Sequence, residues 1–527
     1  MSNYIQGQSR TQTSLFPVSL ETSIDDDNEV RIIDLFVDSL KIEKYGFKVD
    51  FVENGRPGYH PSDLLKLYIY GYMNKVRTSR DLEKECKRNI EVMWLINCLK
   101  PDHNTISNFR RDNTEGINKV FRETVRIAKY FNLIGGTLIA GDSTKLRAQN
   151  SKKNNFNQGK IDRHLAYIEN KLAEYNRALA ENDGDDKKHA EQEIKKHNRR
   201  KDDYKKLEQQ LNETGEVQVS TSDPDSRQMI IRNHITEVAY NVQTTVDAKF
   251  NLPIDYKVTN HNDKKAMGNM LQRAKSILRT NDFTALYDKG YHTGSEFDIA
   301  DELGVEVMVA IPAIPNSSKA PDPAYNVENF IYNENENTYT CPEGHTLNTN
   351  GTWHKSKSGS IFQQFKTRAC KACPVRKLCT KSEKNGKIIQ RRQFAENIEA
   401  NRKRIEENPE TYKKRQAIVE HPYGTIKRQW GFSYVLTKKY LSRASADIGF
   451  MMLSYNLRRL INIIGKDGFR EYLNAICGLF TLFYNSNKLI RSILRLCKFR
   501  IWFSESIFYR SVNRLYLIQN INCNGGF

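Results

Sequence analysis

The sequence predicts an α/β protein in which a mixed β-sheet is covered by helices and an all-helical segment precedes the sheet. Apolar residues recur at helical spacing over residues 30–134. From residue 135 the pattern changes to short apolar runs and to strict alternation, which are typical of strands. The strands come first in a row and then alternate with helices, and this order indicates a mixed sheet with helices packed on it.

The helical segment contains start signals for several short helices. Residues 60–63 place a proline in the first turn before an apolar run, and Thr78 and Asp81 have capping-box spacing. The segment ends in a polar helix tipped by Arg110 and Arg111, which suits a helix-turn-helix reader of DNA. An ordinary helical bundle with a solvated basic face explains the same pattern equally well.

Two aspartates follow predicted strands. The apolar run 137–141 leads to Asp142, and the run 283–287 leads to Asp288. If the two strands are neighbours, these carboxylates lie side by side and repel each other unless a cation separates them. Oxygen ligands of this kind suit Mg²⁺ or Mn²⁺. A single aspartate at a strand end is more often a turn residue, and we interpret Asp247 in that way.

Glu420 is the candidate for a third carboxylate at this site. Lys427 lies seven positions later, and in one continuous helix it would return to nearly the same face. Pro422 lies between them and weakens this interpretation, because a proline starts or kinks a helix. The alternative is that Glu420 is an ordinary charged helix residue.

Two stretches interrupt the predicted sheet. Residues 151–215 carry a heptad seam before a turn and further apolar residues after it, and they predict an antiparallel helical hairpin. Residues 317–394 contain four clustered cysteines: Cys341, Cys370, Cys373 and Cys379. They can hold a structural Zn²⁺, with His345 able to replace one of them, or they can be reduced thiols in a packed insertion.

The composition indicates a partner of high negative charge. Lys and Arg number 82 and Asp and Glu 63 among 527 residues, which gives a net charge of +19. This surplus favours nucleic acid over a membrane surface. A hydrophobic content of 38% excludes a protein with many membrane spans. The chain starts without a secretory signal, and its nine cysteines are an odd number of which five are scattered, so we expect a cytoplasmic, DNA-associated protein with no membrane partner.

Four blocks of the sequence carry a resemblance to a known family. GTLIAGDSTKLRA, HITEVAYNVQTTVD, LYDKGYHTGSEF and IVEHPYGTIKRQWGF occur in this order, and the chain resembles the DDE transposases of bacterial insertion sequences. It is most similar to the group with a cysteine-rich insertion before the catalytic glutamate. The resemblance implies a ribonuclease-H-like catalytic fold, a helical DNA-binding domain and two metal ions. By position, Asp142, Asp288 and Glu420 match the catalytic triad.

The family's signature Tyr-x2-Arg-x3-Glu-x6-Lys maps onto four residues: Tyr412, Arg415, Glu420 and Lys427. The middle gap has four residues here instead of three, so the role of Arg415 stays open. Lys427, Arg428 and Lys289 are expected to neutralise DNA phosphates. The resemblance implies double-stranded DNA as partner, both terminal inverted repeats and target. Cutting two ends suggests at least a dimer.

The predicted organisation places a flexible leader at 1–29 and a helical DNA-binding domain at 30–134. The catalytic domain comprises 135–316 plus 395–464 and carries the two insertions, and a tail of unknown role covers 465–527. The predicted function is metal-dependent cleavage at the ends of an insertion sequence, followed by transfer of the freed 3′-hydroxyl into target DNA. The alternatives are an inactive repressor of transposon origin and a nuclease that cuts without joining.

Overall fold

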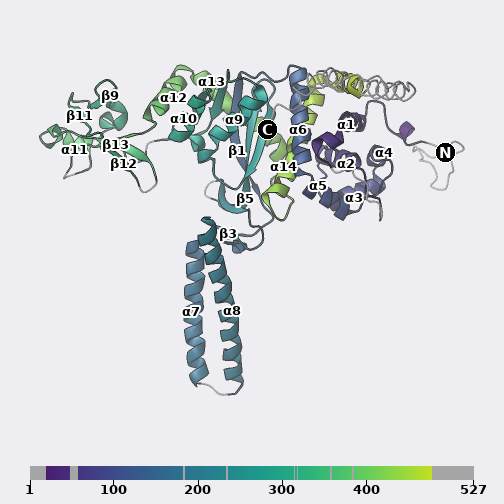
Figure 1. Cartoon of the computed structure of the whole chain (residues 1–527), viewed down its shortest axis with the longest axis horizontal. Coiled ribbons are helices and arrows are strands. Elements are labelled where there is room, and N and C mark those ends of the chain that lie inside the picture. The colour runs from purple at the N-terminus through teal and green to yellow at the C-terminus, as the bar shows by residue number, and fades with distance from the viewer. Residues whose placement is uncertain are drawn as a thin grey trace, which may run out of the picture. The chain divides into compact units, whose positions relative to one another are not determined.

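The structure is a computed structural model of the chain (Figure 1). It describes residues 19–47, 57–181, 184–232, 235–313, 315–316, 318–356, 359–382 and 385–477. Contacts divide the chain into the units Met1–Lys466 and Asp467–Phe527, and the fold below is that of the first. Most of the predicted leader and most of the predicted tail lie outside the described residues. No described helix is both long enough and apolar enough to cross a bilayer.

Six helices form the N-terminal part: α1 (Glu29–Asp38), α2 (Pro61–Met73), α3 (Ser79–Arg88), α4 (Ile90–Leu95), α5 (His103–Asp112) and α6 (Thr114–Tyr130), with the short turns η1 (Glu21–Ser23) and η2 (Ile42–Tyr45). Side-chain caps set their starts. The Thr78 hydroxyl accepts from the Asp81 N–H at 3.1 Å, and Asp102 accepts from the Thr105 N–H at 2.8 Å. The long helix α14 (Leu441–Ile464) contacts α2, α5 and α6 and also the sheet, so it joins the two parts.

The described part of the predicted leader is packed against these helices. Ile24 is 5% exposed, and the Trp94 indole donates to Glu21 at 2.7 Å. These contacts give residues 19–28 a fixed place beside α4, whereas their polar sequence predicted a flexible segment.

A buried ion cluster links α14 to the N-terminal helices. Asp447 of α14 is fully buried and lies 2.9 Å from Arg77 and 3.5 Å from Arg110. Burial acts to raise the pKa of Asp447, but the two guanidinium groups outweigh it and the pKa is lowered. Arg110 is 6% exposed and also donates to the Tyr72 hydroxyl at 3.0 Å, so it is not available to the DNA we expected it to bind. Arg111 is exposed and pairs with the neighbouring Asp112.

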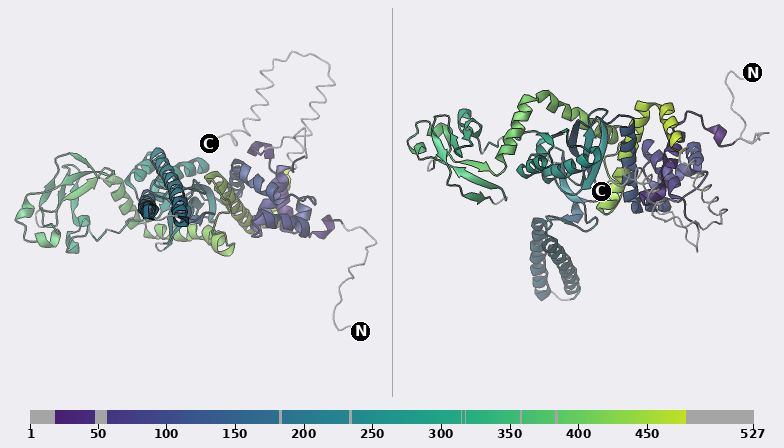
Figure 2. Two further views of the ribbon diagram at one scale, coloured as in Figure 1. Left: turned by 90° about the horizontal axis from the view of Figure 1, so that it is seen from below. Right: turned by 45° about the horizontal axis from the view of Figure 1, so that its top comes forward.

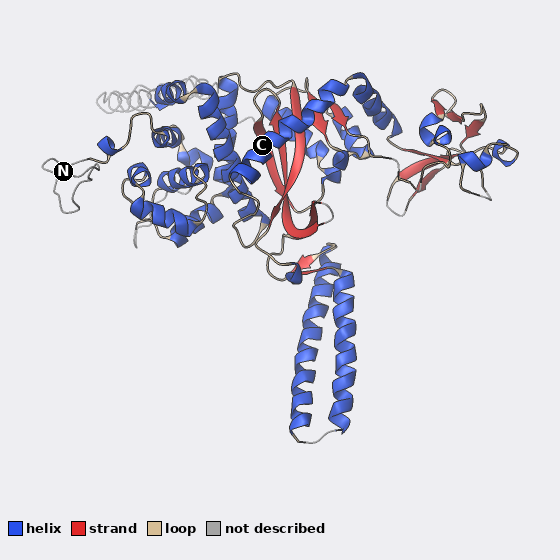
Figure 3. Cartoon of the chain, turned by 180° about the vertical axis from the view of Figure 1, so that it is seen from behind, coloured by secondary structure: helices blue, strands red, loops and turns tan. Residues whose placement is uncertain are grey.

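The central sheet is mixed (Figure 3). Its six strands are β1 (Leu138–Arg147), β4 (Arg227–Arg232), β5 (Ile235–Asp247), β6 (Leu252–Thr259), β7 (Thr284–Tyr287) and β8 (Glu306–Val309). They are ordered β4-β5-β1-β7-β8, and β6 also pairs with β5. Strand β5 is antiparallel to β1, β4 and β6, whereas β7 is parallel to β1 and β8.

Helices contact the strands of this sheet: α9 (Met267–Leu278), α10 (Gly294–Glu302), α12 (Ala395–Glu407) and α13 (Pro409–Tyr423), with the turns η4 (Asp263–Lys265) and η5 (Lys289–Tyr291). One apolar core lies between the sheet and α13, where Ile418 and Val419 pack against Ala140, Val246 and Leu286. A π-helical segment, η9 (Gly424–Gln429), follows α13 directly.

Two further elements stand in the places of the predicted insertions (Figure 2). Helices α7 (Gln158–Glu181) and α8 (Asp185–Thr214) lie side by side, flanked by η3 (Lys152–Asn154) and the paired strands β2 (Asn155–Phe156) and β3 (Val219–Ser220). The cysteine-rich segment contains two three-stranded sheets: β9 (Ile331–Asn333), β10 (Thr338–Thr340) and β11 (Thr346–Asn348), then β12 (Trp353–Lys355), β13 (Ile361–Phe365) and β14 (Ile389–Arg392). Its helical pieces are η6 (Pro323–Tyr325), η7 (Val327–Asn329), η8 (Ala369–Lys371) and α11 (Arg376–Cys379).

The cysteine-rich segment has a small apolar core of its own. Phe330, Tyr339, Leu347, Phe365 and Ile389 are each at most 7% exposed and form one cluster.

Candidate active site

The pairing register of two parallel strands brings Asp142 and Asp288 together. Ala140 of β1 pairs with Leu286 of β7, and the pairing between the two strands ends there. Asp142 and Asp288 each lie two residues further along, so each side chain points to the same face of the sheet as Ala140 and Leu286. That face is the one covered by α13.

The short apolar run predicted that Asp142 follows the end of a strand. In the structure Asp142 lies in the middle of β1 instead. The strand continues to Arg147 because β5 pairs with it along its length, from Ile139↔Asp247 to Arg147↔Ala239. On its other side β1 loses its partner after Ala140, where β7 stops. At Asp142, strand β1 is therefore paired with β5 on one side and has no partner among the described strands on the side of β7.

Both carboxylate oxygens of Asp142 have partners from this chain. Oδ1 accepts from the N–H of Ser143 at 2.7 Å, and Oδ2 lies 3.4 Å from Nη1 of Arg415 on α13. The Tyr423 hydroxyl lies 3.3 Å from the backbone carbonyl of Asp142 and donates to it. Helix α13 and the residue that follows Asp142 thus fix its position.

Burial raises the pKa of Asp142 to about 6, even though the charge of Arg415 and the Ser143 N–H oppose this rise. The negative charges of Asp288 and Asp263 add to the rise, which indicates that three carboxylates share this region. Sequence reasoning missed Asp263. It lies in η4 after β6, pairs with Lys145 of β1 at 2.8 Å, and accepts from Asn241 at 2.6 Å. The only signal for it was a polar run after a strand.

Asp288 begins the turn after β7. Its Oδ1 accepts from the N–H of Gly290 at 2.8 Å, and this hydrogen bond caps η5. The neighbouring Lys289 is exposed. Asp247, in contrast, is fully buried and accepts from the N–H groups of Gly135, Gly136 and Lys249. It organises a turn and is no part of the site.

The structure does not bring Glu420 together with the two aspartates. Glu420 is exposed on α13, and its Oε1 accepts from Gln416 Nε2 at 2.8 Å. The inward neighbour Val419 packs on the sheet instead. Helix α13 passes through Pro422 and then changes to π-helix, so Glu420 and Lys427 are not on one continuous α-helix. Lys427 nevertheless reaches the sheet and donates to the Thr144 hydroxyl at 2.9 Å.

Tyr412 attaches the start of α13 to the end of β7. Its hydroxyl donates to the carbonyl of Tyr287, the residue before Asp288, at 2.9 Å. Burial raises the pKa of Tyr412, the charge of Arg415 opposes this, and the charge of Asp288 adds to it. Arg415 therefore pairs with Asp142, and Tyr412 lies close to both Arg415 and Asp288. Arg428 of η9 is exposed.

The residues at this site supply some of the ligands that a divalent cation needs. Two aspartates on one face of adjacent strands supply the oxygen ligands that Mg²⁺ and Mn²⁺ prefer. Within the described ranges, no three Asp, Glu, His or Cys side chains are grouped closely enough to hold a metal ion. Glu420 would complete the set only with a different side-chain position.

The four cysteines of the insertion lie in one region, but among the described residues no three of them are grouped closely enough to hold a metal ion. Burial raises the pKa of Cys379, and the charges of Cys370, Cys341 and Cys373 add to the rise. The N–H of His345 donates to the sulfur of Cys341 at 3.3 Å. Both Cys341 and Cys379 pack on the small apolar core.

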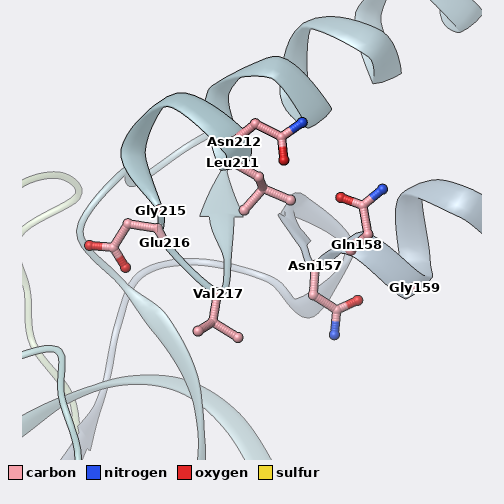
Figure 4. A pocket seen from close by; sticks show the side chains of 8 residues that line it. All are labelled: Asn157, Gln158, Gly159, Leu211, Asn212, Gly215, Glu216 and Val217. Atoms are coloured by element: carbon pink, nitrogen blue, oxygen red, sulfur yellow. The ribbon is translucent and has the colours of Figure 1, made fainter.

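One pocket lies at the base of the hairpin and does not overlap with the aspartates (Figure 4). Residues at the start of α7 and at the end of α8 line it, including Gln158, Leu211 and Glu216. None of the residues that line it is a predicted site residue.

Comparisons with known proteins give two family matches. The family described as "Transposase domain (DUF772)" matches residues 18–112, and the family described as "Transposase DDE domain" matches residues 340–461. Comparison with curated proteins finds no match. A cryo-EM structure of a piggyBac transposase synaptic complex with hairpin DNA is similar with a TM-score of 0.26 and 11% identity, over 90% of this chain and 82% of that one. A TM-score this low carries no argument about fold or activity.

Proposed function

We propose that this chain, which belongs to the DDE transposases of insertion sequences, cuts and joins DNA at a site built on Asp142, Asp288 and Glu420. The observation that carries the proposal is the register of β1 and β7. It leaves both aspartates two residues past the last paired position, on the face covered by the helix that bears Glu420.

We infer that the catalytic sheet is ribonuclease-H-like. The order β6-β5-β1-β7-β8 supports this inference, because β5 and β6 form antiparallel pairs and β7 and β8 run parallel to β1. The family resemblance places the first acid of such a sheet on β1 and the second after β7. Both positions hold aspartates here.

Transposases of the DDE type depend on divalent metal, and we propose Mg²⁺ or Mn²⁺, two ions, as the natural cofactor. When bound, these ions supply a nucleophile at neutral pH and neutralise charge at the phosphorus. Asp142 and Asp288 hold the negative charge that attracts them. Glu420 would join them by giving up its hydrogen bond from Gln416. The fixed backbone at Ser143 and Gly290 keeps both aspartates oriented.

Cations around the aspartates would bind the DNA backbone. Lys289 and Arg428 are exposed on the segments that follow β7 and α13. Lys427 is held against Thr144, two residues after Asp142, where it can neutralise a phosphate next to the cut. Arg111 is the exposed arginine at the end of α5 and stays a candidate for contact with DNA.

The test uses DNA that carries the terminal repeats flanking the coding sequence. Asp142→Asn, Asp288→Asn and Glu420→Gln should each abolish cleavage and leave binding in a gel-shift assay intact. Asp282→Asn, an exposed acid in the loop before β7, and Glu410→Gln, an exposed acid on α13, are the matched controls and should cleave normally. Cleavage that survives all three site substitutions would eliminate this active site.

The same assay separates the alternatives. A repressor would bind the ends without cutting them, and a nuclease would cut without producing joined strands. A transposase should produce covalent junctions between the freed 3′ end and a target plasmid. Since two ends must be cut, we propose at least a dimer on DNA, which light scattering of the assembled complex would measure.

We also propose that the cysteine cluster binds one structural Zn²⁺. The effect of the three other cysteines on the pKa of Cys379 and the N–H···S contact at Cys341 support it, and the thiols would have to move closer together to hold the ion. Metal analysis should find about one zinc per chain, and less than about half an equivalent would contradict the proposal. Cys373→Ser should lose the metal. Cys98→Ser, an exposed cysteine outside the cluster, is the control.

A further inference from the structure

Arg415 occupies the position next to Asp142 that a metal ion would need. Its Nη1 lies 3.4 Å from Asp142 Oδ2, and the two side chains are 19% and 24% exposed. The other oxygen, Oδ1, is already engaged by the Ser143 N–H. A divalent ion on Oδ2 would place two positive centres side by side in a poorly hydrated site, where their repulsion is strong.

The surroundings of Arg415 connect it to the strand end that carries Asp288. Tyr412 contacts the guanidinium and is itself fixed to the carbonyl of Tyr287, immediately before Asp288. The guanidinium thus partly neutralises Asp142, whose charged form is disfavoured by burial and by the nearby charge of Asp288. This also gives a role to an arginine whose spacing from Glu420 departs by one residue from the family signature.

We propose that Arg415 is the resident counter-ion of Asp142 in the metal-free protein, and that it must leave when a divalent cation binds. The inference rests on the proposed active site. The released guanidinium keeps five N–H donors in a planar fork, which match a DNA phosphate better than any other side chain does. Metal binding and DNA binding are then linked through one side chain, which exchanges a carboxylate for a phosphate.

The first test measures Mn²⁺ binding to the DNA-free, full-length chain by calorimetry at low salt. Arg415→Gln should bind Mn²⁺ about three- to tenfold more tightly than the wild type, because the competing cation is gone. Lys414→Gln removes the same charge from the exposed preceding residue, which has no ion pair among the described residues, and should change the affinity less than twofold. An Arg415→Gln affinity equal to or weaker than that of Lys414→Gln would overturn the proposal.

Asp142→Asn separates failure of the exchange from failure of the site. It should lose the Mn²⁺ site. If it binds Mn²⁺ like the wild type, the cation site lies elsewhere and both the proposed function and this inference fall. If Asp142→Asn loses Mn²⁺ while Arg415→Gln gains nothing, the active site stands and only the exchange is wrong.

A second test needs no metal and uses DNA binding in EDTA. In the wild type Arg415 is held by Asp142, so Arg415→Gln should weaken DNA binding less than twofold. In the Asp142→Asn background the guanidinium is released, and adding Arg415→Gln should then cost at least threefold. Equal losses in both backgrounds would contradict the exchange, since a double-mutant cycle without coupling means that the two groups act independently.

Discussion

Gly141, the residue before Asp142, has no room for a side chain. A Cβ at this position would lie 2.0 Å from Cε1 of Tyr287 and 2.7 Å from Cδ1 and Cζ, whereas carbon atoms in contact are about 3.5–4.0 Å apart. The Tyr287 ring is fully buried and is backed by the Tyr291 ring at a centroid distance of 5.0 Å, so it cannot swing away. Gly141→Ala therefore has to displace the strand end that carries Asp288.

The stability change caused by Gly141→Ala is the sum of two opposing effects. Overpacking of a core costs about 1–3 kcal/mol, and an overlap this deep belongs at the upper end. Replacing a strand glycine by alanine returns about 0.5–1 kcal/mol. We expect a net loss of about 2 kcal/mol in the free energy of unfolding, measured by urea titration, and a melting temperature lower by roughly 2 °C for a unit of this size. DNA cleavage should fall as well, because Tyr287 adjoins Asp288.

Gly159 is the matched control for the effect of Gly141→Ala on stability. Gly159 of α7 has a helical backbone and nothing within 4 Å of the place that an alanine methyl group would take, so Gly159→Ala should not lower stability. The double variant Gly141→Ala/Tyr287→Leu should lose less than the sum of its single changes, because the smaller side chain relieves the overlap. If Gly141→Ala unfolds at the wild-type urea concentration, the close packing of β1 against Tyr287 is wrong.

Three further outcomes are expected. Protonation of Asp142, whose pKa is about 6, competes with Mn²⁺ binding. The Mn²⁺ affinity should therefore rise from pH 5 to pH 7 and then level off, with binding at pH 5 roughly tenfold weaker than at the plateau. An affinity that already levels off below pH 5 would contradict this. Asp447→Asn leaves Arg77 buried without its counter-ion and should cost about 3–5 kcal/mol in urea unfolding, and a loss below about 1 kcal/mol would refute the buried pair. Asn401→Ala removes both hydrogen bonds to the backbone of Val309, at 2.8 and 2.9 Å, and should speed amide exchange in β8 by at least tenfold; unchanged exchange would refute it.

The family and several strands of the sheet could be predicted from local sequence patterns. Alternating residues mark β5 and β6, and the acids Asp142 and Asp288 stand out because each follows an apolar run. The four ordered sequence blocks identified a DDE transposase, and the two family matches confirm this. Asp247 was also correctly separated from the site, since it serves a turn.

Other features depend on partners distant in the chain and therefore had no local signal. Arg110 looked like a surface arginine until α14, more than 300 residues later, supplied Asp447 as its buried partner. The length of β1 was underestimated because its second half is held by β5, and at Arg147 also by the segment around Tyr434, both of which are distant in the chain. The contact of Arg415 with Asp142 joins residues that are 273 positions apart.

The sequence by itself determined the chemical class of the protein, because residue types, their order and the charge of +19 are written locally along the chain. Only the tertiary structure decided which cation neutralises which carboxylate, because ion pairing depends on distances of a few ångströms between segments that folding alone brings together. The ion pairs of Arg415 with Asp142 and of Arg110 with Asp447 both form between segments that are distant in the sequence.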